Sequence, residues 1–384
     1  MSLKILVAPS AFKHSLNVNQ VTSCITEGLS RSGLNAEIVE IPVADGGNGT
    51  VDAFLAQGGE RVSFTVSDPL GRPVEADIAI VDEGQTVVIE MALASGLELL
   101  EDDERDPMRA STYGTGQLLD HALDSGARRI IVGMGGSATV DGGIGCISAL
   151  GVQFFDAANE PLPATPESLG LVARIDTSAV DPRWHEVELI VAADVDNPVL
   201  GNRGAAPVFG PQKGAAPDQV LELDRWLAHY FSVVAEQIGV DVRQKPGSGA
   251  AGALAGGIMA FLNGRMQSGI DLLLDYCRFD KHLESANLVI TGEGKLDTQT
   301  LGGKGPIGIV RRAKDKGVPA VILVGAFEGH MQPLRALGVT AVIPIVPAAM
   351  PLDVALDTAS SNLTDAAERL GHLLALGMQL AMTG

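Results

Sequence analysis

Residues 3–50 have the sequence LKILVAPSAFKHSLNVNQVTSCITEGLSRSGLNAEIVEIPVADGGNGT, in which two apolar runs flank an amphipathic stretch. The apolar run at 3–9 predicts a buried strand, and the spacing of apolar residues over 18–29 predicts a helix. Residues 36–43 predict a second strand, and residues 50–56 begin a second helix. Such alternation of strands and helices indicates a parallel sheet with helices on its faces.

The same alternation returns near the other end of the chain. Strands and helices are predicted there, in turn, at 287–291, 306–316, 320–324, 331–337, 341–345 and 361–378. The stretch between the two ends has a different pattern. It begins with three strand-like runs separated by turn signals, which predict an antiparallel meander at 62–66, 74–81 and 86–91.

Beyond the meander the pattern is mixed. The predicted elements are helix 114–123, strand 129–134, helix 142–150, strand 187–192, helix 220–238 and helix 250–262. The proline-rich segment 159–181 is expected to be a surface loop. We therefore predict an α/β fold with two domains. Residues 1–65 and 284–384 form one domain, and residues 66–283 form an inserted, mixed α/β domain.

The composition excludes several classes of protein. The chain has 384 residues, a formal net charge of −20 and no basic stripe, so we expect neither nucleic-acid nor membrane partners. The three cysteines are far apart, which argues against a disulfide framework, and Cys24 and Cys146 are expected in helix cores. The first residues lack a signal-peptide pattern, and the longest apolar run, at 250–262, is too short to span a bilayer. We expect a cytoplasmic protein.

Six loops carry glycine, polar side chains or both, and five of them come just after a predicted strand, where parallel sheets bind their ligands. These loops are residues 9–15, 44–50, 133–143, 193–198, 209–214 and 291–305. Each has a structural alternative, such as an ordinary turn, a helix cap or a solvated side chain. Their number in one chain favours a binding site assembled from several loops.

Two of these loops are dense in glycine and precede a predicted helix. In the loop at 44–50, Asp45 stands at the end of the strand and three glycines follow closely. In the loop at 133–143, the backbone amides of Gly135, Gly136 and Ser137 are suited to phosphate oxygens. In that second loop, the carboxylate of Asp141 either holds a metal ion or caps the helix.

Charged side chains in the other loops suggest ligands for metal and phosphate. Asp194 and Asp196 are oxygen ligands that suit Mg²⁺, with an Asx-turn as the alternative. Lys13 is a candidate to contact a phosphate or a carboxylate, and Lys213 to contact a phosphate. The last loop combines carboxylates and lysines at a strand-to-helix junction, a mixture that fits a nucleotide–Mg²⁺ site. Its candidate residues are Gly292, Glu293, Gly294, Asp297 and Lys304.

Several familiar motifs are missing from the sequence. It contains neither a Gly-x4-Gly-Lys-Ser/Thr loop nor a Gly-x-Ser-x-Gly elbow. Residues 247–252 match a dinucleotide-binding pattern by their letters, but they do not follow a predicted strand. We predict close packing of a glycine- and alanine-rich helix there instead. The seven histidines form no metal-binding motif.

Taken together, the motifs resemble those of bacterial-type glycerate kinases, the glycerate 2-kinase family. The resemblance runs from Lys4 to about Met378. It is carried by ADGGNGT at 44–50, GMGGSATVDGG at 133–143, DVDNP at 194–198, FGPQKG at 209–214 and TGEGKLD at 291–297. Where this family commonly has Asp, Glu and Asn, the chain has Ser10, Asn48 and Val140. The resemblance implies a flavodoxin-like domain built from both chain ends and an inserted α/β domain.

The resemblance also implies an activity, namely transfer of the γ-phosphoryl group of ATP to a hydroxyl of D-glycerate, with 2-phosphoglycerate as the expected product. ATP and Mg²⁺ are the implied cofactors, with Asp194 and Asp196 holding the metal. The alternatives for a general base are Asp45 and Asp297. The groups that would bind phosphates or offset charge are those of Gly135, Gly136, Ser137, Gly292, Glu293, Gly294, Lys13, Lys213 and Lys304.

Two other functions stay open at this point. One is a kinase or phosphatase that acts on another small hydroxy acid, and the other is a ligand-binding protein without catalytic activity. The sequence also leaves open whether the chain is a monomer or a homodimer.

Overall fold

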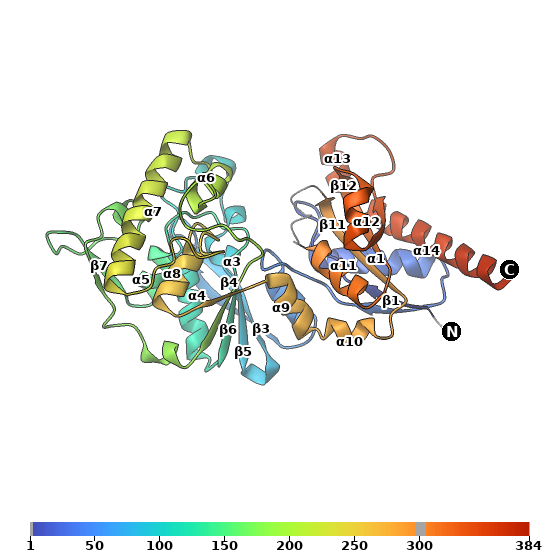
Figure 1. Cartoon of the computed structure of the whole chain (residues 1–384), viewed down its shortest axis with the longest axis horizontal. Coiled ribbons are helices and arrows are strands. Elements are labelled where there is room, and N and C mark those ends of the chain that lie inside the picture. Colours follow the sequence, from blue (N-terminus) through green and yellow to red (C-terminus); the bar gives the residue numbers. More distant parts are fainter. Residues whose placement is uncertain (1–2, 297–304, 384) are drawn as a thin grey trace. The chain divides into compact units, whose positions relative to one another are not determined.

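The computed structural model describes residues 3–296 and 305–383 and divides into two compact units. Unit 1 comprises Met1–Asp45 and Ile270–Gly384, and unit 2 is the continuous segment Gly46–Gly269. Both units contain a β-sheet and helices, which confirms the predicted α/β class (Figure 1).

Unit 1 contains a five-stranded parallel sheet in the order β13-β12-β11-β1-β2. Its strands are β1 (Leu3–Val7), β2 (Ala36–Glu40), β11 (Leu288–Leu296), β12 (Ala320–Phe327) and β13 (Val339–Pro344). Because β1 pairs with both β2 and β11, the strands of this unit lie in the order 2-1-3-4-5. This order is that of flavodoxin-like folds, as expected.

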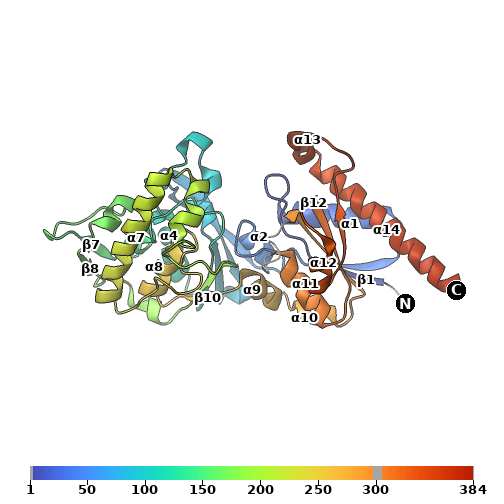
Figure 2. The ribbon, with the colours of Figure 1, turned by 45° about the horizontal axis from the view of Figure 1, so that its top comes forward.

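Two long helices of unit 1 pack together on the sheet. The helices of this unit are α1 (Val18–Arg31), α9 (Gly269–Tyr276), α10 (Phe279–Leu283), α11 (Pro306–Asp315), α12 (Met331–Leu337), α13 (Leu352–Asp357) and α14 (Ala359–Thr383). Figure 2 shows α14 running alongside α1, and their apolar faces share a core with β1 that includes Ile25 and Leu363. The two helices approach so closely that a Cβ atom on Gly28 would lie 2.2 Å from the carbonyl oxygen of Thr364. Glycine is therefore required at this crossing.

Unit 2 contains a six-stranded mixed sheet in the order β10-β9-β6-β5-β4-β3. Its strands are β3 (Glu60–Ser67), β4 (Pro73–Val81), β5 (Thr86–Glu90), β6 (Arg129–Gly133), β9 (Glu188–Ala192) and β10 (Arg265–Gln267). The first three are antiparallel, which confirms the predicted meander, and β5, β6, β9 and β10 are parallel. The carboxyl ends of four strands therefore meet at one edge of this sheet.

The helices of unit 2 cover this sheet and enclose the larger core. They are α2 (Thr50–Leu55), α3 (Ala92–Ser95), α4 (Tyr113–Asp124), α5 (Ile144–Ala149), α6 (Ala205–Phe209), α7 (Pro217–Gln237) and α8 (Leu254–Phe261). α7 begins with proline at its first position, a favourable place for it, and buries Leu227 and Phe231. A Cβ atom on Gly252 would lie 2.0 Å from the carbonyl oxygen of Thr139. Close packing at Gly252 is therefore confirmed, but the predicted helix is wrong at this point, because residues 247–253 form turns and α8 begins only at Leu254.

The boundaries of the units differ from the predicted domain limits of 1–65, 66–283 and 284–384. β3 pairs with β4 along its whole length, and α2 packs on β4 and β5, so the segment after Asp45 belongs with unit 2. At the other boundary, Arg312 of α11 donates to Asp275 at 2.6 Å and to Asp271 at 2.9 Å, which ties α9 to unit 1. The observed boundaries depend on how short elements pair and pack. The hydrophobic pattern of the sequence does not show this pairing and packing, so it did not predict them.

A second difference concerns the segment 159–181, which we expected to be a loop. It contains β8 (Arg174–Asp176), which pairs antiparallel with β7 (Gln153–Phe155). The guanidinium group of Arg174 lies 3.6 Å from the centroid of the Phe155 ring and stabilises this pair. Strands of three residues are too short to show an alternating pattern, which explains why the sequence did not predict them.

The expected placement of two cysteines in helix cores is confirmed. Cys24 on α1 and Cys146 on α5 are both buried. Among the helices of the described residues, none is both long and apolar enough to cross a membrane.

Candidate functional site

The carboxyl edge of the unit 2 sheet is continuous, because hydrogen bonds join the chain just beyond each strand end. Met91 N donates to Gly133 O at 3.1 Å, and Met134 N donates to Ala192 O at 3.1 Å. Ala193 N donates to the carbonyl oxygen of Gln267, also at 3.1 Å. The loops that follow β5, β6, β9 and β10 therefore start side by side.

Two of the predicted glycine loops interlock at this edge. We name residues 46–51 the first glycine segment and residues 133–137 the second glycine segment. Gly135 N donates to Gly46 O at 2.9 Å, and a Cβ atom on Gly135 would lie 2.4 Å from the Cα atom of Gly47. Gly136 has φ +78°, and a Cβ atom there would lie 2.3 Å from Oδ1 of Asn48. Both glycines are therefore needed for the two backbones to approach.

A buried lysine supports the second glycine segment. The side chain of Lys213 is 2% exposed, and its Nζ atom donates to Ser137 Oγ and to Thr139 O, both at 2.7 Å. Burial lowers the pKa of Lys213 to about 7, although the nearby Asp141 carboxylate opposes this. The predicted phosphate contact of Lys213 stays a prediction, and in this structure its ammonium group holds the loop that carries Ser137.

Asp141 is fully buried and organises the start of α5. Its carboxylate accepts hydrogen bonds from Thr112 N at 2.8 Å, Thr112 Oγ1 at 2.7 Å and Gly143 N at 3.0 Å. Burial raises the pKa of Asp141, and these hydrogen bonds oppose the shift. Of the two alternatives for this residue, metal ligand or helix cap, the geometry is that of the cap.

Asp194 and Asp196 follow β9 in the loop that we predicted to bind metal. Asp194 is half-buried, whereas Asp196 is exposed and pairs with Arg203 at 2.5 Å. Within residues 3–296 and 305–383, no three His, Cys, Asp or Glu side chains gather into a metal-binding cluster. Mg²⁺ is commonly held by only one or two carboxylates together with water and substrate phosphates, so the two carboxylates of this loop fit such an ion.

Glu90 is a residue of this edge that the sequence analysis missed. It ends β5, is 4% exposed, and its carboxylate accepts hydrogen bonds from Gly49 N at 3.0 Å and Val51 N at 3.3 Å. Burial raises the pKa of Glu90 to about 7, while these backbone hydrogen bonds lower it. The signal in the sequence was a single glutamate that ends the apolar run at 86–89.

In unit 1 the predicted site residues gather where β1 and β11 end. Ser10 donates to Gly292 O from both N and Oγ, each at 2.9 Å. A Cβ atom on Gly294 would lie 3.4 Å from the backbone nitrogen of Lys13, whose side chain is exposed. Asp45, which is half-buried, is the last residue of this unit before the first glycine segment.

The expected loop at 291–305 begins later than predicted. Gly292, Glu293 and Gly294 lie inside β11, and the first two pair with β12. Their predicted contact with phosphate stays a prediction. A Cβ atom on Gly325 of β12 would lie 2.5 Å from the carbonyl oxygen of Gly294, so glycine there permits close strand pairing. Two further candidates, Asp297 and Lys304, lie outside the described residues.

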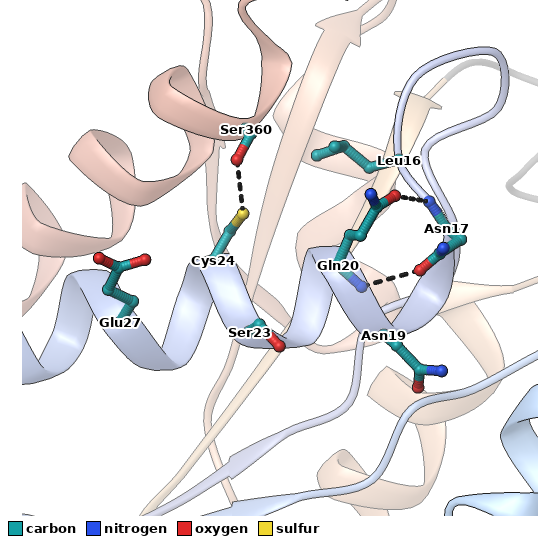
Figure 3. Close-up of a pocket in the computed structure, with 8 residues that line it drawn as sticks. All are labelled: Leu16, Asn17, Asn19, Gln20, Ser23, Cys24, Glu27 and Ser360. Carbon is teal, nitrogen blue, oxygen red and sulfur yellow. Dashed lines mark hydrogen bonds between the residues drawn. The ribbon is translucent and has the colours of Figure 1, made fainter.

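An open hollow of about 440 Å³ lies along α1 and contains none of the predicted site residues (Figure 3). Asn17 and Gln20, whose side chains cap the start of α1, lie at one end of it. Sγ of Cys24 lies 3.2 Å from Oγ of Ser360 farther along the helix. The side chains that line the hollow form no arrangement suited to catalysis.

Comparison with known proteins agrees with this geometry. Residues 5–375 match the model of the glycerate kinase family. The chain is 44% identical over 367 residues to a glycerate kinase of Halalkalibacterium halodurans, covering 95% of this chain and 97% of the relative. It is 41% identical over 381 residues to a glycerate 2-kinase of Escherichia coli K12, covering 99% and 100%.

A solved structure supports the same assignment. The crystal structure attributed to a glycerate kinase 2 of Salmonella typhimurium LT2 superposes with a TM-score of 0.85 at 38% identity, covering 99% of this chain and 100% of that one. The motifs in both units, the fold and these full-length matches lead to one conclusion: the chain is an enzyme that belongs to the glycerate kinase family.

Proposed function

We propose that this enzyme transfers the γ-phosphoryl group of ATP to a hydroxyl of D-glycerate, giving 2-phosphoglycerate and ADP. The observation that carries the proposal is the pair of interlocked glycine segments at the carboxyl edge of the unit 2 sheet, in a chain that matches the glycerate kinase family over residues 5–375. The name of the Escherichia coli relative, glycerate 2-kinase, supports 2-phosphoglycerate as the product.

The second glycine segment is suited to binding phosphate. Phosphoryl transfer depends on positioning and on neutralising charge, with little covalent help from the protein. Gly135 and Gly136 have no side chains, so main-chain atoms lie at the edge of the sheet there, and Ser137 adds a hydroxyl group. Lys213 would hold this segment in place through its hydrogen bond to Ser137. Its ammonium group would also contribute positive charge near the phosphates.

Asp194 is the better suited of the two metal candidates. Asp194 is half-buried at the end of β9, whereas Asp196 is exposed and pairs with Arg203. Asp194, with Asp196 as the alternative, would hold Mg²⁺, whose positive charge would neutralise the phosphates.

The remaining roles concern the acceptor. Lys13 has an exposed ammonium group that would bind the glycerate carboxylate or offset developing charge. Asp45 and Asp297 remain the alternatives for the base that takes the proton of the acceptor hydroxyl. A base of this kind usually contributes about 10²- to 10⁴-fold to the rate.

The test is an ADP-release assay with Mg²⁺ and ATP across D-glycerate, L-glycerate and tartronate. We expect turnover with D-glycerate, and phosphorus NMR of the product should show the 2-phosphate ester. The 3-phosphate ester would correct the position of transfer alone. Measurable ATP binding without ADP release from any of these acids would contradict the proposed kinase activity and favour the ligand-binding alternative.

A further inference from the structure

The amino end of α2 is occupied by the protein's own carboxylate. Gly49 N donates to Oε1 and Oε2 of Glu90 at 3.0 and 3.1 Å, and Val51 N donates to Oε2 at 3.3 Å. These N–H groups belong to the first turn of a helix, where they have no partner within the helix. An anion is favourable at such a position. Glu90 therefore satisfies these amides from within the protein.

The burial of Glu90 makes this arrangement unusual. The side chain is 4% exposed at the end of a strand whose other residues are also buried. Among the ion pairs of the described residues, none includes Glu90, and the charged group that acts on it is Asp52, which is also acidic. A buried carboxylate without a cation depends on its hydrogen bonds for stability. The loop amides and Glu90 therefore stabilise each other.

Fixing Gly49 also fixes the segment that precedes it. Gly49 has φ +90°, and Thr50 Oγ1 donates to Gly47 O at 2.6 Å, which closes the turn. Asn48, between them, lies directly over Gly136 of the second glycine segment. Contacts thus run from the Glu90 carboxylate through Gly49 and Asn48 to the segment that carries Ser137.

We propose that Glu90 is a positioning residue whose carboxylate holds residues 46–51 against residues 133–137 and so sets the shape of the second glycine segment. Glu90 acts through the backbone and has no role in contacting substrate. The expected effect on catalysis rests on the proposed kinase function. The expected effect on the loop does not, so the two can be tested separately.

In the first experiment, the Glu90 carboxylate is removed by substitution and formate, a small carboxylate, is added to the solution. Glu90→Ala leaves a buried space lined by N–H donors, which formate can enter as a substitute anion. We expect a lowered thermal midpoint for Glu90→Ala that formate raises again, with no comparable rise for the natural chain. Formamide, which is neutral and of similar shape, is the matched control, and sodium chloride keeps ionic strength constant. Equal effects of formate and formamide, or no effect of either, would overturn the proposal.

The matched control variant is Glu188→Ala. Glu188 lies on the same sheet, at the start of β9, and pairs at its surface with Arg129 at 2.7 Å. Its removal leaves no buried anion site, so formate should not change the midpoint of this variant. A formate response in Glu188→Ala equal to that in Glu90→Ala would show a general salt effect and would count against the proposal.

The second experiment uses Glu90→Gln, which keeps the volume of the side chain if the alanine variant does not fold. Glutamine keeps one acceptor oxygen and replaces the other by an NH₂ group, which cannot accept hydrogen bonds, so at least one of Gly49 and Val51 should exchange its amide hydrogen faster than in the natural chain. If the enzyme is a kinase, we expect kcat/KM for ATP to fall about 100-fold, the size expected for a misplaced loop. Unchanged exchange at both amides would overturn the positioning role, whatever the outcome of the kinase assay.

Discussion

The Lys213 ammonium nitrogen lies 2.7 Å from the hydroxyl oxygen of Ser137, beneath a glycine-rich segment and closed off from solvent. The same nitrogen donates to the carbonyl oxygen of Thr139 at 2.7 Å. A lysine in this position contributes to the shape of the segment through its hydrogen bonds and to the electrostatics of the edge through its charge.

Replacing Lys213 by Met keeps most of the side-chain volume and removes both hydrogen bonds. We expect kcat/KM for ATP to fall by about 10²- to 10³-fold, the range seen when a stabilising donor is lost from an active site. The KM for D-glycerate should change much less. Steady-state kinetics with each substrate varied in turn will measure both effects, and an equal rise in both KM values would contradict the assignment of Lys213 to the phosphate-binding segment.

Lys213 also predicts a pH dependence of stability. Its pKa is lowered to about 7 in the folded chain, from 10.5, by burial. Between these values the unfolded chain binds more protons, so the contribution of Lys213 to stability grows as pH rises above 7 and is lost as pH falls through 7. Relative to Lys213→Met, the natural chain should gain roughly 2 to 3 kcal/mol between pH 7 and 9. Urea unfolding at several pH values will test this, and parallel stability curves would contradict it.

Asp141 and Asp194 should behave differently when their carboxylates become amides. The Asp141 carboxylate accepts four hydrogen bonds, from Thr112, Gly143 and Gly145, and Asp141→Asn removes one of its two acceptor oxygens, so we expect a loss of about 1 to 3 kcal/mol in the free energy of unfolding. The Mg²⁺ concentration for half-maximal turnover should not change. A normal stability combined with weakened Mg²⁺ dependence would return Asp141 to the metal-ligand alternative.

Asp194→Asn should show the opposite result, with stability close to that of the natural chain and Mg²⁺-dependent turnover abolished. Asp196→Asn is the control, because its exposed pair with Arg203 contributes little to stability and it is the weaker metal candidate. Turnover measured against Mg²⁺ concentration distinguishes the two variants. A near-normal kcat for Asp194→Asn would remove it from the metal role.

The contact between Gly136 and Asn48 can be tested with a matched pair of substitutions. Gly136→Ala places a methyl group 2.3 Å from Asn48 Oδ1 at φ +78°, whereas Gly126→Ala has φ +81° with nothing within 4 Å. Both variants bear the strain of a left-handed backbone, roughly 1–2 kcal/mol. We expect the thermal midpoint to fall further, and the KM for ATP to rise, only for Gly136→Ala. Adding Asn48→Ala should partly reverse this loss, and a double variant no better than Gly136→Ala would contradict the close contact.

The sequence predicted the elements that have a long, regular pattern. The strand–helix alternation at both ends was sufficient for the sheet of unit 1, and the runs at 62–66, 74–81 and 86–91 were sufficient for the meander. Where glycine interrupts a strand, the pattern failed. β11 continues through Gly292 and Gly294 because β12 continues beside it, and that neighbour is not visible in the local sequence.

The candidate site was predictable only as a set of loops. The sequence around Gly135, Gly136 and Ser137 indicated a ligand-binding loop, because an ordinary turn before a helix does not need so many glycines. The burial of Lys213 depends on packing from distant segments, and the sequence had suggested a phosphate contact for it. For Asp141 the sequence had left metal ligand and helix cap as alternatives, and the hydrogen bonds from Thr112, which is distant in the sequence, could not be predicted. Glu90 gave no motif at all, because its partners are backbone amides that any sequence carries.

The pairing of β1 with β11 has a consequence for synthesis on the ribosome. Lys4 N donates to Asn287 Oδ1 at 2.8 Å across a separation of 283 residues, so the first strand emerges long before its neighbour exists. Unit 2 is one continuous segment and can fold as soon as it leaves the exit tunnel. Meanwhile, within the first 45 residues, β1 can pair only with β2, so the side of this apolar strand that β11 will cover stays exposed, which makes this stretch the part of the nascent chain most in need of a chaperone.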